Sequence, residues 1–257
     1  MPIPLRALVL FVVAMLAACA APPPTLERVA IPPATRQVVL VTNEHWAATD
    51  ARLQRFERDG GGGWRQVGGP VAVTVGRSGF GWGLGLHRDG EGPIKNEGDG
   101  RAPAGVFELG TAFGYAADAP AGCRVAYRAA GERDYFVDDA GSTDYNRWRR
   151  IPDGEANDPK ARWQSCERMR RDDHQYEFGM VVEHNDACVP GRGSAIFLHV
   201  WQQPGAPTSG CTAMARSDLL ALLRWLDPTA RPLLVQAPRG VVAEVGIAEV
   251  GVAGEGR

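Results

Sequence analysis

The chain has 257 residues, enough for one medium-sized domain with a buried core and a tail. Its 28 basic and 30 acidic residues leave a formal net charge of −2, and no long run of one sign occurs. The composition therefore gives no support for nucleic-acid binding, and we expect no nucleic-acid partner.

Residues 1–18 have the features of a signal peptide. Arg6 supplies one positive charge, and residues 7–17 form an apolar run that is shorter than the ~20 residues needed to cross a bilayer. The run ends in Leu-Ala-Ala-Cys, which resembles the lipobox of bacterial lipoproteins. In that family the cysteine is acylated, so the resemblance implies lipidation of Cys19. Alanine rather than aspartate follows it, which implies the periplasmic face of the outer membrane. Secretion without a lipid is the alternative.

An oxidising compartment such as the periplasm usually leaves cysteines paired in disulfides. Besides Cys19, the chain contains Cys123, Cys166, Cys188 and Cys211. If Cys211 stays free, the other three allow three pairings, among which the sequence does not choose. The shortest loop between separate elements favours Cys166–Cys188.

The chain divides into a tether, a domain and a tail. Residues 19–36 contain several prolines and little periodicity, so we expect an extended tether. The folded domain is expected over residues 37–238, and it begins with an apolar, β-branched strand at 37–42. Residues 239–257 show no firm periodicity and are expected to form a flexible tail.

The first half of the domain carries strand signals. Residues 51–58 alternate polar and apolar side chains, and residues 64–67 return after a glycine turn, which predicts a hairpin. Residues 71–76 predict another strand. The glycine-rich run at 79–85 is followed by neither a helix nor Lys-Ser/Thr, so we predict a strand or close-packed loop rather than a nucleotide site. His87 lies in a polar turn and is expected to be solvated.

Residues 95–110 combine a charged loop with the turn Pro-x-Gly-x-Phe, which delivers an apolar strand. The loop charges, among them Glu97, Asp99 and Arg101, form either a substrate-facing rim or a solvated surface.

The region between Cys123 and Cys188 is irregular. Its acidic residues lack a partner histidine or a calcium-loop spacing, so we expect no metal site. Residues 163–169 predict a short helix, with Ser165 as a possible cap. Residues 177–185 predict a strand that ends in polar residues.

The chemistry of the chain centres on a histidine and a cysteine 12 positions apart. Residues 193–199 predict a buried strand that ends in His199, and Gly210 lets a tight turn expose Cys211. A free thiol has a pKa near ~8.5, and an imidazole that takes its proton would create the reactive thiolate. His199 is therefore the candidate base and Cys211 the candidate nucleophile. The alternative is a structural cysteine beside a satisfied strand-end histidine.

The clearest helix follows Cys211. Ser217 is a good N-cap, several leucines form an apolar face, and Pro228 ends the helix. Residues 231–236 predict the closing strand.

Two stretches resemble the L,D-transpeptidase (YkuD-type) family, and the resemblance covers roughly residues 38–236. The family carries a histidine on a strand followed by Ser/Thr-x-Gly-Cys, as residues 196–214 do here. It also carries Thr-Pro-x-Gly-x-Phe, which residues 102–107 match with alanine in place of threonine. The resemblance implies a mainly β, sandwich-like catalytic domain with a helix after the cysteine. It further implies action on peptidoglycan stem peptides without a metal or organic cofactor.

The resemblance also implies roles for individual residues. Cys211 would be the acyl-accepting nucleophile, and His199 the general base. The Gly210 and Cys211 amides would help to form the oxyanion hole, in the turn that includes Ser209.

The group that orients His199 is not evident from the sequence. His184, Asn185 and a backbone carbonyl all remain open. Asn185 also joins Glu97, Asp99 and Arg101 as a candidate residue of the substrate rim.

Ala213 stands two residues after the cysteine, where better-known family members place arginine. The change leaves the nucleophile intact but leaves the acyl acceptor open. The acceptor is either an amine of a neighbouring stem or envelope protein, or water. With water as the acceptor, the protein would be a hydrolase, either an L,D-carboxypeptidase or an amidase. A non-catalytic envelope-binding lipoprotein is the alternative from a different class.

Overall fold

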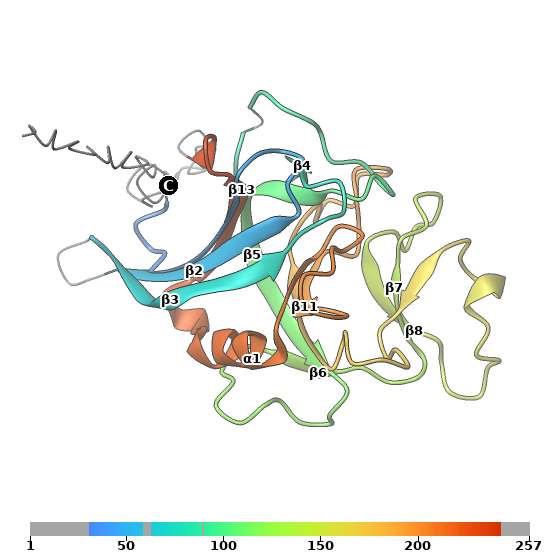
Figure 1. Ribbon diagram of the computed structural model, residues 1–257. Helices are drawn as coiled ribbons and strands as arrows, with labels where there is room; N and C mark the ends of the chain where they lie inside the picture. Colours follow the sequence, from blue (N-terminus) through green and yellow to red (C-terminus); the bar gives the residue numbers. More distant parts are fainter. Residues whose placement is uncertain (1–30, 59–62, 89, 243–257) are drawn as a thin grey trace, which may run out of the picture.

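The computed structural model describes residues 31–58, 63–88 and 90–242, so Cys19 and most of the predicted tail lie outside it (Figure 1). The described part is mainly β with one α-helix late in the domain, which confirms the predicted fold class. None of the helices in this part is long and apolar enough to span a membrane.

In chain order the strands are β1 (Gln37–Asn43), β2 (Asp50–Arg58), β3 (Trp64–Thr74), β4 (Phe80–Trp82), β5 (Ala102–Gly114), β6 (Tyr127–Ala129), β7 (Asp134–Val137), β8 (Arg147–Arg150), β9 (Cys166–Arg168), β10 (Phe178–Val182), β11 (Phe197–Val200), β12 (Thr212–Met214) and β13 (Leu233–Pro238). The helices are the 3-10 turn η2 (Pro159–Ala161), α1 (Arg216–Trp225) and the 3-10 turn η3 (Pro228–Ala230).

The main sheet closes on itself. Its order is β10-β11-β12-β3-β2-β1-β13-β5-β4, and β5 also pairs with β10. β5 closes the sheet because it is 13 residues long: its first half pairs with β13 and its second half with β10. The sandwich-like packing that the sequence predicts is thus made by one folded-over sheet.

One apolar core lies inside this sheet and under α1. β1 is buried along its whole length because β2 and β13 flank it and side chains pack on both of its faces. The helix adds the buried residues Leu219, Leu222 and Leu223 to the same cluster. This packing fixes β12, which leads into the helix, and hence the cysteine turn before it.

A small sheet of three strands, in the order β8-β7-β9, stands beside the main sheet (Figure 1, right). Phe136 of β7 contacts Phe197 of β11, with ring centroids 5.1 Å apart, and Trp148 of β8 contacts Phe113 of β5 at 5.7 Å. Cys211 belongs to this aromatic cluster. The small sheet therefore forms a wall next to the cysteine.

The predicted helix at residues 163–169 is wrong. Residues 166–168 form β9, in which Glu167 lies opposite Phe136 of β7. Only three residues long, this strand depends on its pairing partner, and a local sequence pattern does not reveal such a partner.

Two further element boundaries differ from the prediction. Residues 64–67 and 71–76 were expected to form separate strands, but one strand, β3, runs through most of both. An irregularity opposite Leu53 and Arg55 of β2 absorbs the intervening glycines. Ser217 is not the N-cap of α1: the helix begins at Arg216, and Ala215 caps it without a side-chain bond.

His87 is buried, which contradicts the expectation of a solvated residue. Its Nδ1 accepts a hydrogen bond from the Val106 amide at 3.1 Å, and its ring stacks on Trp82 at 5.6 Å. Gly105 makes the room, because a Cβ there would lie 1.9 Å from the imidazole, and its φ of +141° also favours glycine. The turn predicted at Pro-x-Gly-x-Phe is wrong: residues 103–107 lie within β5, where they pair with β4 and β13. The glycine of this motif has a packing role instead.

Residues 31–36, at the end of the predicted tether, pack against the domain. Ile31 is buried, and the Arg36 amide donates to the Ala230 carbonyl at 2.7 Å. Arg58 of β2 donates to the Thr35 carbonyl at 2.8 Å.

Candidate active site

The parallel pairing of β11 and β12 brings the histidine strand to the cysteine turn. His199 pairs with Ala213, which places Cys211 beside Phe197. Residues two apart on a strand share a face, so His199 and Phe197 point to the side on which Cys211 lies.

Cys211 is buried, and its thiol is held by the backbone of the neighbouring segment. Sγ accepts a hydrogen bond from the Phe197 amide at 3.3 Å and lies 3.5 Å from the Ala195 carbonyl, to which the thiol donates. Burial raises the pKa of the thiol well above its usual range, and the nearby Glu167 carboxylate adds to the effect. The resting group is therefore a thiol, which needs a base before it can attack.

His199 is held in the form that a base requires. Its Nδ1 lies 2.8 Å from the Val200 carbonyl. A carbonyl only accepts hydrogen bonds, so Nδ1 carries the proton and Nε2 carries the lone pair. Burial lowers the pKa of His199 to about 4, so the ring is neutral near pH 7. Of the three orienting groups that the sequence left open, the backbone carbonyl is the one in contact with His199.

Tyr176 contacts both His199 and a residue of the cavity onto which Cys211 opens. Its ring lies 5.4 Å from that of His199, and its hydroxyl donates to Glu167, which lines the same cavity as Cys211. Within the described residues no hydrogen bond joins His199 to Cys211 directly. Proton transfer between them requires the thiol to turn away from the Ala195 carbonyl, and catalytic contacts often tighten in this way only when substrate binds.

Cys211 opens onto a cavity of about 270 Å³. The cysteine turn and the segment before β11 form one part of its lining, and acidic residues from the small sheet and from the loop before β5 form the other. The lining consists of Arg77, Lys95, Glu97, Gly98, Asp138, Glu167, Ser194, Ala195, Ile196, Ser209, Gly210 and Cys211.

The cysteine turn is braced by Thr208. The Gly210 amide donates to the Thr208 hydroxyl at 3.1 Å, and this hydroxyl donates to the Cys211 carbonyl at 2.6 Å. Gly210 also packs closely, since a Cβ there would lie 3.1 Å from the Arg101 carbonyl. Ser209 is exposed at the mouth of the cavity. To donate a hydrogen bond to an oxyanion, the Gly210 amide would first have to break its hydrogen bond to the Thr208 hydroxyl.

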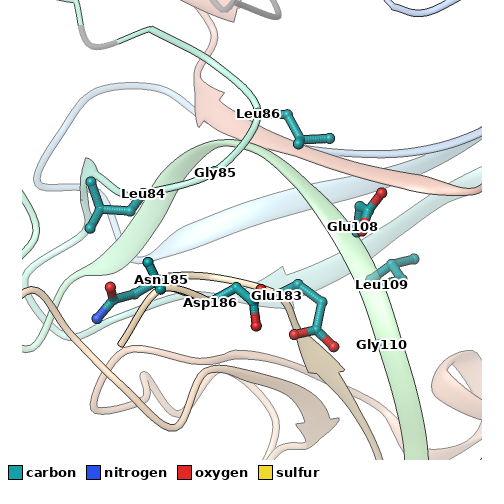
Figure 2. Close-up of a pocket in the computed structure, with 10 residues that line it drawn as sticks. Leu84, Gly85, Leu86, Glu108, Leu109, Gly110, Glu183, Asn185 and Asp186 are labelled. Carbon is teal, nitrogen blue, oxygen red and sulfur yellow. The ribbon is translucent and has the colours of Figure 1, made fainter. Parts of the chain in front are cut away.

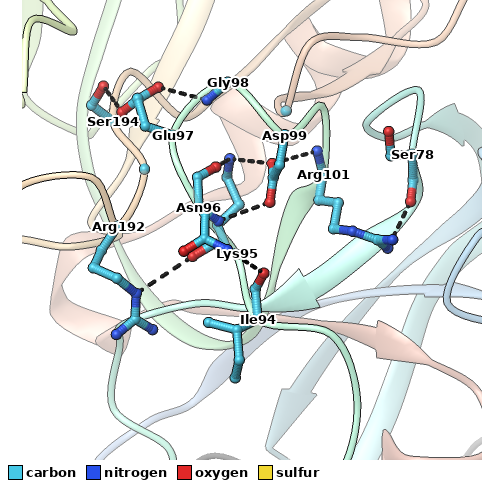
Figure 3. A network of polar contacts seen from close by, with 12 residues as sticks. Ser78, Ile94, Lys95, Asn96, Glu97, Gly98, Asp99, Arg101, Arg192 and Ser194 are labelled. Atoms are coloured by element: carbon cyan, nitrogen blue, oxygen red, sulfur yellow. Dashed lines mark hydrogen bonds and ion pairs between the residues drawn. The ribbon is translucent and has the colours of Figure 1, made fainter.

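The charged loop before β5 contributes one predicted rim residue to this cavity. Glu97 lines it and accepts a hydrogen bond from the Tyr145 hydroxyl at 2.5 Å. It accepts another from the Ser194 hydroxyl at 2.7 Å (Figure 3). The loop therefore presents Glu97 to the cysteine, with its carboxylate fixed by two hydroxyl groups.

Asp99 and Arg101 organise the same loop instead of lining the cavity (Figure 3). Asp99 accepts hydrogen bonds from Lys95 Nζ at 2.8 Å and from the Asn96 amide at 2.7 Å. The Arg101 guanidinium donates to the carbonyls of Ser78 and Phe80, both at 2.8 Å. Both side chains therefore form hydrogen bonds within the protein's own loops.

Asn185 lies at a different cavity. It is almost fully buried, and its Nδ2 donates to the carbonyls of Val189 and Gly193 at 3.0 and 2.9 Å. The cavity beside it, of about 520 Å³, includes Glu183 and Glu108 in its lining but not Cys211 (Figure 2).

His184 is also a structural residue. Its Nδ1 accepts from the Leu84 amide at 3.1 Å, and its Nε2 lies 3.0 Å from the Arg192 carbonyl. Burial lowers its pKa to about 3, so the ring stays neutral. Both ring nitrogens are thus occupied without His199.

Asp138 and Glu167, which the sequence does not single out as site residues, share the cavity with Cys211. Glu167 lies in the segment that the sequence predicts as a helix, and that prediction does not indicate which way its side chain points. In a strand, successive side chains point to opposite faces of the sheet, so Glu167 points to the face opposite to that of Cys166 and Arg168.

All four cysteines of the described chain are free, so none of the predicted disulfide pairings, Cys166–Cys188 included, is present. Cys211 is the buried one among them.

A comparison with known protein families matches residues 46–237 to YkuD, the L,D-transpeptidase catalytic domain. No curated protein matches the chain. The matched region spans most of the domain. It includes the Pro-x-Gly-x-Phe motif, the strand that carries His199 and the turn that carries Cys211. The chain belongs to the YkuD family of L,D-transpeptidase catalytic domains.

Proposed function

We propose that the protein is a cysteine acyltransferase of the cell envelope that acts on peptidoglycan stem peptides through a thioester on Cys211. The observation that carries this proposal is the placement of Cys211: its thiol lines a cavity and lies next to the strand that holds a neutral, oriented imidazole. Membership of an L,D-transpeptidase family supports the substrate class.

The first half of the reaction uses both residues. Nε2 of His199 takes the thiol proton, and the sulfur attacks the carbonyl of the bond between an L-centre and a D-residue. The C–N bond breaks, and the imidazolium protonates the departing amine. The Cys211 amide, and the Gly210 amide once it releases Thr208, would stabilise the oxyanion.

The second half transfers the acyl group to an amine of a neighbouring stem peptide or envelope protein. To test the whole cycle, the purified protein is incubated with a disaccharide-tetrapeptide and an amine, and the products are separated by mass. We expect release of the terminal D-residue and a new amide product.

Cys211→Ala should abolish both products, whereas Cys188→Ala, which removes a cysteine outside the cavity lining, should retain them. If folded wild-type protein with a reduced thiol yields neither product, the proposal is wrong.

Hydrolysis is a second candidate because of Ala213. This residue is fully buried between β11 and β3, so no charged group occupies the position where better-known relatives have arginine. Product analysis with and without added amine separates the two reactions: a hydrolase gives the same tripeptide product in both cases.

We further propose that Cys19 carries a lipid that anchors the protein to the periplasmic face of the outer membrane. The support is the lipobox-like sequence that ends in this residue. Cys19→Ala is expected to move the protein from the membrane fraction to the soluble fraction, and unchanged fractionation would contradict the anchor.

A further inference from the structure

The Cys211 cavity contains three carboxylates. Glu97, Asp138 and Glu167 line the cavity, and in the described part of the chain no arginine or lysine forms an ion pair with any of them. Asp134 of β7, by contrast, pairs with Arg128 and Arg150, both at 3.2 Å. The cavity therefore holds negative charge that the protein does not neutralise with a salt bridge.

Glu167 is the carboxylate tied most directly to the reacting pair. It lies opposite Phe136 on the face of the small sheet that packs against Phe197 of β11. The Tyr176 hydroxyl donates to its Oε2, while the described residues provide no hydrogen bond to Oε1. One carboxylate oxygen is thus fixed, and the other is left to a ligand.

Asp138 supplies a second acceptor. Its Oδ1 is buried and has no hydrogen-bond partner among the described residues. A buried acceptor without a donor is unfavourable, so this atom is suited to a donor that the substrate brings.

The basic residues near these acids are already engaged. Lys95 is almost fully buried and binds Asp99 at 2.8 Å. Arg171, which packs over the Tyr176 ring at 5.1 Å, pairs with Asp173 at 2.9 Å.

Arg77 is the other basic residue of the lining. Its amide donates to the Thr208 carbonyl at 2.8 Å, which places its backbone at the cysteine turn. Two basic residues, Arg77 and Lys95, against three carboxylates leave the lining with an excess of acidic groups, which suits a cation.

We propose that Glu167 and Asp138 bind the protonated amine of the acyl acceptor beside Cys211, and that Glu167 takes its proton. This inference rests on the proposed acyltransferase function and decides between its two candidate reactions in favour of transfer to an amine. It makes the small sheet the acceptor side of the active site, since β9 carries Glu167 and Asp138 directly follows β7.

The proton balance of the transfer step is complete with these residues. The ammonium gives one proton to the Glu167 carboxylate, and the neutral amine attacks the thioester carbonyl. The new C–N bond forms as the C–S bond breaks. The remaining surplus proton passes from nitrogen through His199 to the sulfur, which restores the thiol, and Glu167 releases its proton to water.

The surroundings of Glu167 suit a base that works near pH 7. Burial raises its pKa to about 7, and the neighbouring charges of Asp138 and Glu97 act in the same direction, against the Tyr176 hydrogen bond and Arg171. A carboxylate with such a pKa accepts a proton far more readily than an exposed glutamate does.

The test compares a charged acceptor with an uncharged one. Wild-type protein and Glu167→Gln are given the tetrapeptide donor together with methylamine, which is protonated at neutral pH, or hydroxylamine, which is not. Glutamine keeps the size of the side chain and an acceptor for Tyr176 but removes the charge and the base. We expect transfer to methylamine to fall by about tenfold or more, transfer to hydroxylamine to change by less than about twofold, and thioester formation on Cys211 to persist.

Glu132→Gln is the matched control, because Glu132 pairs with Arg168 at 3.1 Å outside the cavity lining; both transfers should keep their wild-type rates. If Glu167→Gln does not fold, Asp138→Asn takes its place, with an expected rise in the KM for methylamine but not for hydroxylamine. Equal losses with both acceptors, or no loss with either, would overturn the inference while leaving the thioester chemistry standing. Absence of any thioester on wild-type Cys211 would overturn the proposed function, and this inference with it.

Discussion

His199 and Cys211 rest in their uncharged forms, and this determines how the pair can act. Burial lowers the pKa of the imidazole to about 4 and raises that of the thiol. A preformed thiolate–imidazolium pair, as found in some cysteine enzymes, is therefore not the resting state. The Val200 carbonyl leaves Nε2 as the free lone pair, so His199 acts as a base when substrate arrives.

This resting state predicts a slow reaction of Cys211 with small alkylating reagents. Because the thiolate is the reactive form, modification by iodoacetamide should be at least about tenfold slower at pH 7 than for an unstructured peptide thiol, and should rise steadily into the alkaline range. Mass analysis of the peptide that contains Cys211 measures the rate. A plateau of fast modification at neutral pH would instead reveal a thiolate.

Among the elements, β5 connects the two family motifs. Its first half carries the Pro-x-Gly-x-Phe motif, and its Gly105 leaves space for the buried imidazole of His87. Its second half pairs with β10, which in turn pairs with β11 and so supports the His199 strand. A change at Gly105 therefore acts on the sheet that carries the site.

Gly105→Ala should destabilise the fold strongly. The new Cβ would lie 1.9 Å from the His87 ring, at a φ of +141° that side chains rarely adopt. Overpacking and backbone strain together predict a loss of about 3 kcal/mol in the free energy of unfolding, measured with urea.

Gly69→Ala is the control, since Gly69 on β3 has open space around its Cα and should change the stability by less than about 0.5 kcal/mol. Equal stabilities of the two variants would show that Gly105 does not make room for His87.

At the scale of the whole molecule, buried titratable groups determine how stability depends on pH. His184 and His199 have folded pKa values of about 3 and about 4, so the unfolded chain binds more protons as the pH falls below about 6.5, and stability is lost. Glu167 acts in the opposite direction. Its folded pKa of about 7 lies above the unfolded value of ~4.3, so its contribution to stability decreases as the pH rises between these values.

Glu167→Gln should therefore steepen the loss of stability on acidification. Between about pH 6 and 5, we expect the free energy of unfolding to fall by about 1 kcal/mol per pH unit more than in the wild type, because the opposing proton uptake by the folded state is removed. Urea unfolding at several pH values measures the slope. Parallel curves for the two proteins would show that Glu167 is ionised in the folded state throughout this range.

The sequence predicted those parts of the fold that local patterns encode. The apolar run before His199, the glycine at the cysteine turn and the leucine-rich helix each carry their own signal. The strand β9 does not, because three residues become a strand only through pairing with β7. The closure of the sheet by β5 and β10 likewise joins segments that lie far apart in the sequence.

In the candidate site, too, local sequence patterns predict some residues, while others are placed only by the tertiary packing. Glu97, Asp99 and Arg101 share one charged loop and one local signal, yet only Glu97 lines the cavity, because the other two bind groups of the protein itself. Neither Asp138 nor Glu167 could be placed from the sequence, since each reaches Cys211 only through the packing of the small sheet on β11.

The central claim, a thioester on Cys211 formed with the help of His199, is tested most directly by trapping the acyl-enzyme with the tetrapeptide donor in the absence of amine. We predict that wild-type protein gains the mass of the donor less its terminal D-residue, on the peptide that contains Cys211. We also predict no gain for Cys211→Ala and acylation slowed by about 10²-fold or more for His199→Gln. Acylation of the same mass in Cys211→Ala, or wild-type rates in His199→Gln, would contradict the account.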